Sequence, residues 1–136
     1  MTIIYTDGAA SGNPGPGGWG VFIIQGKKTE KLWGREVMTT NNKMELRAAI
    51  EGLKYFKFRR GIILRTDSKY VLKGIEEWME GWKSRDWKTS GGKPVKNKGL
   101  WQELDYWNNF HNVTWEWVKG HSGDYGNDMA DKLATF

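Results

Sequence analysis

The first third of the chain carries the apolar alternation of β-strands. Three runs rich in Ile, Val, Phe and Trp are separated by segments rich in Gly, Pro and Lys, a pattern typical of short strands. The expected strands are residues 2–7, 19–25 and 29–37. The stretch GNPGPGG at 12–18 predicts a loop without regular structure. The turn Gly26-Lys27-Lys28 predicts that the second and third strands form an antiparallel hairpin.

The apolar period changes to that of a helix near Thr39. From there to Phe56, apolar side chains recur every three or four positions after a Thr/Asn cluster suited to N-capping. Gly61 then begins a strand that leads to Asp67. The elements expected after it are a helix capped by Ser68 and running to Ile75, a short helix at 76–83, a loop at 84–98, a helix at 100–110, a strand at 112–120 and a closing helix at 126–136.

The order of these elements predicts an α/β fold, in which helices pack on a mixed sheet. The link from the third strand through the long helix to the fourth strand is a crossover, which is expected to be right-handed. Such a crossover can bring the fourth strand back parallel to the first. Asp7 and Asp67 would then lie side by side at the carboxyl ends of neighbouring strands, where α/β sheets bind ligands.

Length and composition narrow the class of protein. A chain of 136 residues predicts a single domain over residues 1–136. Because the chain has no cysteine, any metal would be held by oxygen or imidazole ligands. The N-terminus lacks the pattern of a signal peptide, and no apolar run approaches the roughly 20 residues that span a bilayer. We therefore expect a soluble, cytoplasmic protein.

The net charge of +5 is concentrated in one segment. Residues 83–98 hold six of the 21 basic residues and one of the 16 acidic residues, so the rest of the chain is balanced. The segment contains Trp87 and follows Trp78 and Trp82. Composition alone is compatible with a solvated basic loop. The interleaved tryptophans favour contact with a phosphate backbone, because cations attract phosphates while rings pack on sugars or bases.

Four acids occupy positions from which they can converge. Asp7 and Asp67 end apolar strands, where a carboxylate is costly unless a cation meets it. Glu45 lies at the edge of the apolar face of its helix, and Asp131 lies a turn before the apolar end of the last helix. Crowded carboxylates repel and their pKa values rise, a conflict that divalent cations resolve. Oxygen-only ligands favour Mg²⁺ or Mn²⁺, and two ions about 4 Å apart could activate a water for phosphodiester hydrolysis.

Each of these acids also has an ordinary explanation when it is taken singly. Glu45 suits the first turn of a helix, where the dipole favours an acid. Asp7 before a glycine could form a turn, Asp67 could cap a helix, and Asp131 could be a solvated surface charge. Only the set, placed on elements that can meet, favours a metal site.

Five ordered motifs resemble bacterial ribonuclease H of type I. They are YTDGAASGNPGPGGWG, TTNNKMELRAAIEGL, RTDSKYV, WKTSGGKPVKNKGLW and WVKGHSGDYGNDMADKLA, in register from Thr6 to about Ala134. The resemblance implies a ribonuclease H-like fold, with three antiparallel strands followed by two parallel ones and helices on both faces. It also implies a monomeric, Mg²⁺-dependent endonuclease that hydrolyses the RNA strand of RNA/DNA hybrids, using two ions and leaving 5′-phosphate and 3′-hydroxyl ends.

The resemblance makes the same four acids the metal ligands and adds one catalytic histidine. His121 matches a mobile-loop histidine thought to relay protons or help product leave, and Gly120 and Gly123 would allow it to move. Without the motif, His121 would be a loop histidine of no assigned role. His111 matches no motif and receives no role.

The resemblance further implies four groups of substrate-binding residues, of which the asparagines of the first group could otherwise be turn and helix-cap residues. Asn13, Asn41 and Asn42 would read the RNA strand, because an amide can donate to and accept from a ribose 2′-hydroxyl. Thr40 and Asn97 would grip a DNA phosphate, and Trp78 and Trp82 would pack on deoxyribose. The segment 83–98, with Lys83, Lys88 and Lys96, would form a basic handle that adds electrostatic grip.

Two positions depart from the family pattern. Lys69 stands where many members have glutamine, so a hydrogen bond there could become a phosphate contact. Asp124 adds a charge in the loop after His121, which bears on loop flexibility and pH behaviour, and Asp128 is a candidate outer-shell acid. Two rival functions stay open at this point: a hybrid-binding module that does not cut, and another nuclease on the same sheet, such as a junction resolvase or an integrase-like enzyme.

Overall fold

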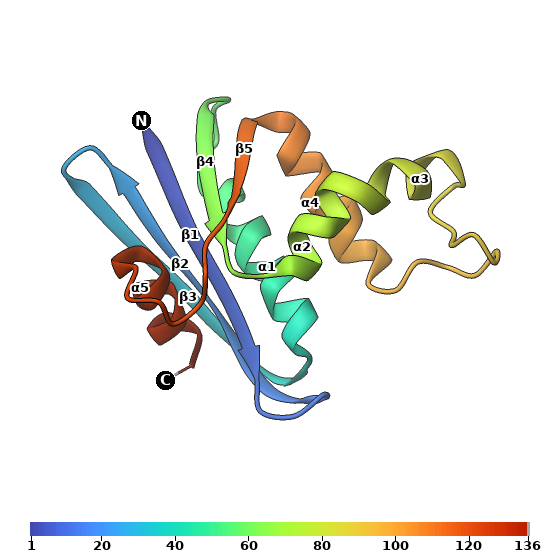
Figure 1. Cartoon of the computed structure of the whole chain (residues 1–136), viewed down its shortest axis with the longest axis horizontal. Coiled ribbons are helices and arrows are strands. Elements are labelled where there is room, and N and C mark those ends of the chain that lie inside the picture. The colour runs from blue at the N-terminus through green and yellow to red at the C-terminus, as the bar shows by residue number, and fades with distance from the viewer. Residues whose placement is uncertain (136) are drawn as a thin grey trace.

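A five-stranded mixed sheet forms the centre of the molecule (Figure 1). The computed structural model describes residues 1–135, and the strand order is β3-β2-β1-β4-β5. β1 pairs antiparallel with β2, and β2 with β3, whereas β4 pairs parallel with both β1 and β5. The predicted fold class is therefore confirmed. The strands are β1 (Thr2–Ala10), β2 (Gly15–Gln25), β3 (Lys28–Thr39), β4 (Gly61–Thr66) and β5 (Asn112–Trp117).

Helices cover both faces of the sheet. α1 packs against β1 and β2 on one face and α5 packs against the same strands on the other, while α4 lies alongside α1. The helical run from α2 to α3 and the segment after it extend away from the sheet (Figure 1). The helical elements are α1 (Asn41–Lys54), α2 (Lys69–Lys73), the π-helical turn η1 (Gly74–Trp78), α3 (Met79–Ser84), α4 (Lys98–Phe110) and α5 (Tyr125–Thr135).

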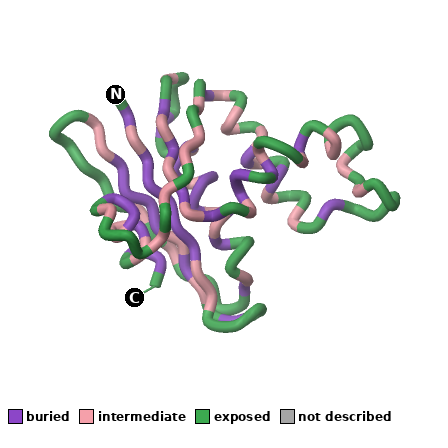
Figure 2. The backbone as a smooth tube through the Cα atoms, viewed as in Figure 1, coloured by how far each residue is buried: buried purple, intermediate pink, exposed green. Residues whose placement is uncertain are grey.

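The alternation of side chains along the central strands produces two cores. Ile4 and Val21 face α1 and are fully buried with Leu46 and Ile50 of that helix. Tyr5 and the neighbouring Phe22 face the other way and pack with Ala130 of α5. Burial is accordingly concentrated in the central strands and in the helix faces that meet them (Figure 2). None of the helices within residues 1–135 is long and apolar enough to cross a membrane.

The predicted loop at 12–18 was wrong over its second half. β1 continues to Ala10, and β2 already begins at Gly15. Gly17 pairs with Ala10 in this extension, and an irregularity in the β2–β3 register falls between Gly15 and Gly17. A Cβ on Gly17 would lie 2.6 Å from the Ala9 carbonyl oxygen, so glycine allows a close backbone approach here instead of breaking the strand.

The two predicted helices at 68–75 and 76–83 form one continuous helical run, Lys69–Ser84, with η1 in its middle. The π-helical turn η1 begins at Gly74, which packs closely against Trp101. A Cβ at Gly74 would overlap the indole ring of Trp101. A π-turn adds a residue within a helix, which changes the facing of the residues that follow without ending the helix.

Three smaller boundaries also differ from the prediction. Phe56 lies beyond the end of α1 yet is buried in the core. β5 ends at Trp117 and not at the predicted 120. β5 is an edge strand, and the Trp117 side chain is 49% exposed. The Lys69 ammonium lies 5.5 Å from the centroid of the Trp117 ring. The closing helix begins at Tyr125, and the predicted last position, 136, lies outside the described residues.

His111, which received no role from the sequence, is a buried structural residue. Its Nδ1 accepts a hydrogen bond from the Arg60 backbone N–H (3.3 Å), so Nε2 carries the ring proton and donates to the Leu53 carbonyl (2.9 Å). The ring therefore joins the end of α1 to the approach to β4. A lone histidine before a strand gave no pattern from which this bridge could be predicted.

Candidate active site

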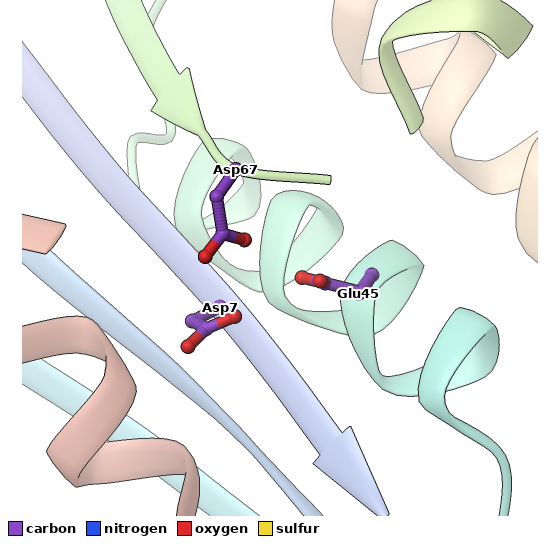
Figure 3. Close-up of side chains that lie close together, drawn as sticks. All are labelled: Asp7, Glu45 and Asp67. Carbon is purple, nitrogen blue, oxygen red and sulfur yellow. The ribbon is translucent and has the colours of Figure 1, made fainter. Parts of the chain in front are cut away.

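Three of the four predicted acids converge at the end of the parallel strands (Figure 3). Asp7 comes from β1, Asp67 follows β4 and Glu45 comes from the first turns of α1. One carboxylate oxygen from each lies within 4.8 Å of the others, and the three side chains point toward one another. Thr6 pairs with Thr66 in the β1–β4 register, and the residue after each threonine is an aspartate, so Asp7 and Asp67 lie side by side just beyond the last parallel pair.

Gly8 explains how Glu45 reaches Asp7, which lies within β1, and Asp67, which follows β4. A Cβ on Gly8 would overlap backbone atoms of Met44 and Glu45, so the backbone of α1 rests directly on β1. The helix begins just before this contact, where the Thr40 hydroxyl accepts a hydrogen bond from the Lys43 N–H (3.2 Å). The close approach of helix and strand places the Glu45 carboxylate beside Asp7.

Gly8→Ala should therefore damage both stability and the acid cluster. The added methyl group would push α1 away from β1, and we expect a loss of about 3 kcal/mol in the free energy of unfolding. Gly61→Ala is a matched control, because a Cβ there meets no atom within 4 Å. Chemical denaturation of both variants measures the difference, and equal stabilities would contradict the tight contact.

Burial and mutual repulsion make this cluster electrostatically strained. Burial, the charge of Asp67 and the proximity of Asp131 raise the pKa of Asp7 to about 8. Burial and the charges of Asp7 and Asp67 raise the pKa of Glu45 well above its usual value. Burial also raises the pKa of Asp67. None of the ion pairs found within residues 1–135 involves these acids.

The donor set fits a hard divalent cation. The Glu45 Oε1 atom is buried and has no hydrogen-bond partner in the described part of the chain. An unpartnered buried carboxylate oxygen is costly unless a ligand meets it. Carboxylate oxygens are the ligands that Mg²⁺ and Mn²⁺ prefer. Asp7, Glu45 and Asp67 could therefore hold such an ion.

Asp131 lies at the border of the cluster. It lies on α5 and is close enough to Asp7 to raise the pKa of that aspartate, but it is outside the group of three. Glycines on β2 let α5 approach the sheet, since a Cβ on Gly18 would lie 2.6 Å from the Ala134 carbonyl oxygen. The Arg35 guanidinium also donates to the Leu133 carbonyl (2.6 Å), which anchors the end of the helix that carries Asp131.

His121 lies in the exposed loop between β5 and α5, near Asp67. Its charge opposes the rise in the pKa of Asp67. Its backbone is left-handed (φ 56°), and a Cβ on Gly120 would lie 2.6 Å from an Asp67 carboxylate oxygen. The loop therefore passes directly against Asp67, and glycine at position 120 is needed for that approach.

Asp124 caps α5. Its Oδ1 accepts a hydrogen bond from the Asn127 N–H (3.1 Å), and its carbonyl accepts one from the Asp128 N–H (2.9 Å). The loop charge noted in the sequence thus has a structural task at the start of the helix that carries Asp131. Its position immediately before a helix was a signal that could have indicated a cap.

Asp124→Ala should lower the free energy of unfolding by about 1 kcal/mol through loss of this cap. Asp124→Asn keeps an oxygen acceptor and should stay close to the original protein. Thermal unfolding of the two variants separates these outcomes, and an alanine variant as stable as the asparagine variant would argue against the cap.

The predicted RNA-reading and phosphate-gripping residues line a single cavity of about 290 Å³. The Asn13 Oδ1 accepts from the Asn41 N–H (3.0 Å), and the Asn41 Oδ1 accepts from the Ala10 N–H (2.6 Å). These bonds tie the loop between β1 and β2 to the start of α1. The cavity is lined by Asn13, Thr40, Asn41, Asn42, Lys96 and Asn97.

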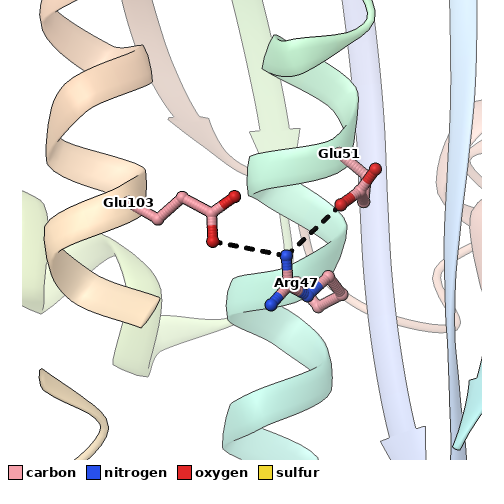
Figure 4. A network of polar contacts seen from close by, with 3 residues as sticks. All are labelled: Arg47, Glu51 and Glu103. Atoms are coloured by element: carbon pink, nitrogen blue, oxygen red, sulfur yellow. Dashed lines mark hydrogen bonds and ion pairs between the residues drawn. The ribbon is translucent and has the colours of Figure 1, made fainter. Parts of the chain in front are cut away.

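An ion-pair network spans the two helices beside this cavity (Figure 4). Arg47 of α1 lies 3.3 Å from Glu51 on the same helix and 3.5 Å from Glu103 of α4, measured between guanidinium nitrogen and carboxylate oxygen. Half-exposed pairs of this kind contribute little to stability. They do connect α1 and α4, whose N-terminal ends carry Thr40 and Asn97.

The predicted channel tryptophans form part of a ring cluster. Trp78 and Trp82 are half-buried, with ring centroids 5.8 Å apart, and Trp82 also lies 5.3 Å from the buried Trp101 and 6.3 Å from Trp87. Each therefore combines packing with partial exposure.

The predicted cationic residues differ in their surroundings. Lys83 is paired with Asp105 (3.2 Å), so its charge is partly neutralised. Lys88 and Lys96 are exposed on the segment 83–98, and Lys69 is exposed beside Trp117.

Comparison with known proteins gives one consistent family. The family model for RNase H matches residues 1–136. A protein named Ribonuclease H from Ruthia magnifica is 60% identical over 134 residues, which cover 98% of this chain and 92% of that protein. One named Ribonuclease HI from Pseudomonas putida is 57% identical over 132 residues, covering 97% of this chain and 89% of that protein.

Solved structures agree with this match. The crystal structure of LC9-RNase H1, described as a type 1 RNase H with the type 2 active-site motif, has a TM-score of 0.87 and 34% identity, and the match covers 98% of this chain and 69% of that one. The resemblance to bacterial ribonuclease H of type I is confirmed, and the chain belongs to the ribonuclease H family.

Proposed function

We propose that this protein is a monomeric, Mg²⁺-dependent endonuclease that hydrolyses the RNA strand of RNA/DNA hybrids without strict sequence preference. The observation that carries this proposal is the cluster of Asp7, Glu45 and Asp67, whose carboxylate oxygens lie within 4.8 Å of one another in a member of the ribonuclease H family. The relatives named Ribonuclease H and Ribonuclease HI support the same activity. Cleavage without sequence preference is expected if the protein contacts the sugars and phosphates of the hybrid, because these groups do not differ between bases.

The four acids and His121 would divide the chemistry between them. Asp7, Glu45, Asp67 and Asp131 would hold two divalent cations. When bound, the cations supply Lewis-acid activation of the attacking water and stabilise the leaving oxygen. The water would lose a proton as it attacks the phosphorus in line, the bond from phosphorus to the 3′-oxygen would break, and the leaving 3′-oxygen would take up a proton. The products would carry a 5′-phosphate and a 3′-hydroxyl. His121, exposed near Asp67, would help to pass a proton in this step.

The cavity around Asn13 and Asn41 would recognise the RNA strand. The amide oxygens of both residues already accept backbone hydrogen bonds, so their amide N–H groups are the donors that can reach a 2′-hydroxyl oxygen. Asn42 would join them. Thr40 and Asn97, on the same cavity, would bind a phosphate of the DNA strand, and Trp78 and Trp82 would pack on deoxyribose.

The basic handle, defined as residues 83–98, would add electrostatic grip. Replacing Lys88 and Lys96 with alanine should weaken hybrid binding and reduce the slope of log affinity against log salt by about 0.9 for each phosphate that is no longer neutralised. Lys27 and Lys28, exposed at the turn between β2 and β3, provide a matched double-alanine control. Binding isotherms at several salt concentrations check this, and equal slopes for the two double variants would remove the handle from the binding surface.

Cleavage of labelled duplexes tests the proposed function directly. The protein is incubated with an RNA/DNA hybrid labelled on either strand, in Mg²⁺ and then in EDTA. We expect Mg²⁺-dependent shortening of the RNA strand alone. Binding without cutting would favour a hybrid-binding module, and cleavage of duplex DNA would favour a different nuclease on the same sheet.

A further inference from the structure

Tyr70 joins two parts of the proposed substrate surface. Its hydroxyl oxygen accepts one hydrogen bond from the Asn97 amide (3.1 Å) and another from the Trp101 indole N–H (3.0 Å). Its ring centroid lies 5.2 Å from that of Trp101 and 5.9 Å from that of Trp78. Tyr70 thus contacts Asn97, which lines the cavity of about 290 Å³, and the half-buried Trp78.

Asn97 stands at the N-cap position of α4 but does not cap the helix. Its backbone is left-handed (φ 60°, ψ 30°), a conformation that asparagine tolerates, and no side-chain hydrogen bond closes the first turn. An N-cap asparagine usually accepts a hydrogen bond from a first-turn N–H group. Here the side chain is turned to Tyr70 instead. The first N–H groups of α4 are therefore left without a side-chain acceptor.

We propose that Tyr70 is a positioning residue for substrate binding, whose hydroxyl holds the Asn97 amide away from the N-terminus of α4. Asn97 then presents its second amide N–H to a phosphate of the DNA strand, together with the uncapped start of the helix. Tyr70 can act in this way only if the proposed function holds, because that function makes Asn97 a phosphate ligand. Lys96, in the same cavity, adds positive charge for the same anion.

The bond to Trp101 fixes the tyrosine itself. Trp101 is fully buried, and Gly74 leaves the room into which its indole packs. The two N–H donors occupy both lone pairs of the Tyr70 hydroxyl, so its orientation is set before any substrate arrives. Losing the hydroxyl frees Asn97 to swing back and cap α4, which would weaken binding without touching the carboxylates that carry out the reaction.

Tyr70→Phe tests this, because it removes the hydroxyl and keeps the ring. Hybrid affinity in EDTA should fall about fivefold, the worth of one net hydrogen bond. In Mg²⁺, KM for the hybrid should rise by about the same factor while kcat stays within about twofold. Tyr106→Phe, on the exposed side of α4, is the matched control and should change neither value. The unpaired Trp101 N–H should lower the Tm by about 5 °C, so all measurements are made well below the transition.

Non-additivity with Asn97 distinguishes positioning from a structural effect. Asn97→Gly removes the amide without strain at this left-handed position and should weaken hybrid binding about tenfold. The double variant should bind like Asn97→Gly alone, with the same salt slope. Multiplied losses in the double variant, about fiftyfold in all, would overturn the proposal. Unchanged affinity in Asn97→Gly would overturn it together with the role of Asn97 as a phosphate ligand, while leaving the proposed cleavage activity intact. An original protein that does not bind the hybrid would overturn both the inference and the proposed function.

Discussion

Asp7→Asn should reduce cleavage of the RNA strand by at least about a thousandfold while leaving the protein folded and able to bind hybrid. Asp7 has a carboxylate oxygen within 4.8 Å of oxygens of Asp67 and Glu45, and it lies close enough to Asp131 for that aspartate to raise its pKa. Asparagine has nearly the same shape but brings no negative charge to a divalent cation. Several kcal/mol of transition-state stabilisation depend on that cation, and each 1.4 kcal/mol corresponds to about a factor of ten in rate.

Asp86→Asn is the matched control for this variant. Asp86 is an exposed acid of the handle with a left-handed backbone (φ 55°), a conformation that asparagine also tolerates. The same chemical change there should leave kcat close to that of the original protein. Single-turnover cleavage assays of both variants provide the comparison. If kcat falls by less than about tenfold in Asp7→Asn, the acid cluster is not required for cleavage.

The metal-free protein should lose a stabilising contribution from Asp7 as the pH rises from about 4 to about 8. Its pKa is 3.8 in the unfolded chain and about 8 in the folded protein, so the folded state holds more protons throughout this window. Stability therefore falls with increasing pH, and the contribution is fully present only below about pH 4. The total change is on the order of 5 kcal/mol for a shift of this size.

Comparison with Asp7→Asn isolates this contribution from that of the other acids. In EDTA, the variant should show a smaller decline in stability than the original protein across pH 4 to 8, and it should be the more stable of the two at pH 8. Added Mg²⁺ should remove most of the decline in the original protein, because the cation balances the ionised carboxylates. Parallel stability curves for the two proteins in EDTA would contradict the raised pKa of Asp7.

Much of the fold and three members of the acid cluster followed from patterns within the sequence. The apolar runs that lead to Asp7 and Asp67 predicted strands that end at both acids; Asp67 does follow β4, whereas β1 continues past Asp7 to Ala10. The crossover through the long helix predicted that the two strands are parallel neighbours, as they are. Glu45 could be placed because its position relative to Leu46 sets the helix face on which it lies. These inferences depend on local periodicity and on chain topology, both of which the sequence carries directly.

Close approaches between distant segments could not be predicted in the same way. Glycines within a stretch such as 12–18 predict a loop, but Gly17 lies within a strand. Gly8 lets α1 lie directly on β1, and Gly74 makes room for Trp101. The hydrogen bond from Asn97 to the Tyr70 hydroxyl could not be predicted either, because nothing near Tyr70 in the sequence indicates Asn97 as its partner. Such features depend on which segments meet after folding, and they account for the errors at 15–18 and within the run from α2 to α3.

Anomalous scattering from a crystal soaked in Mn²⁺ tests the central claim most directly. We predict strong peaks bound by carboxylate oxygens of Asp7, Glu45 and Asp67, with Asp131 at the edge of the same site, and their disappearance in a soaked crystal of Asp7→Asn. A soaked crystal of the original protein with no Mn²⁺ peak among these carboxylates would contradict the central claim, which is that these acids form a binding site for divalent cations.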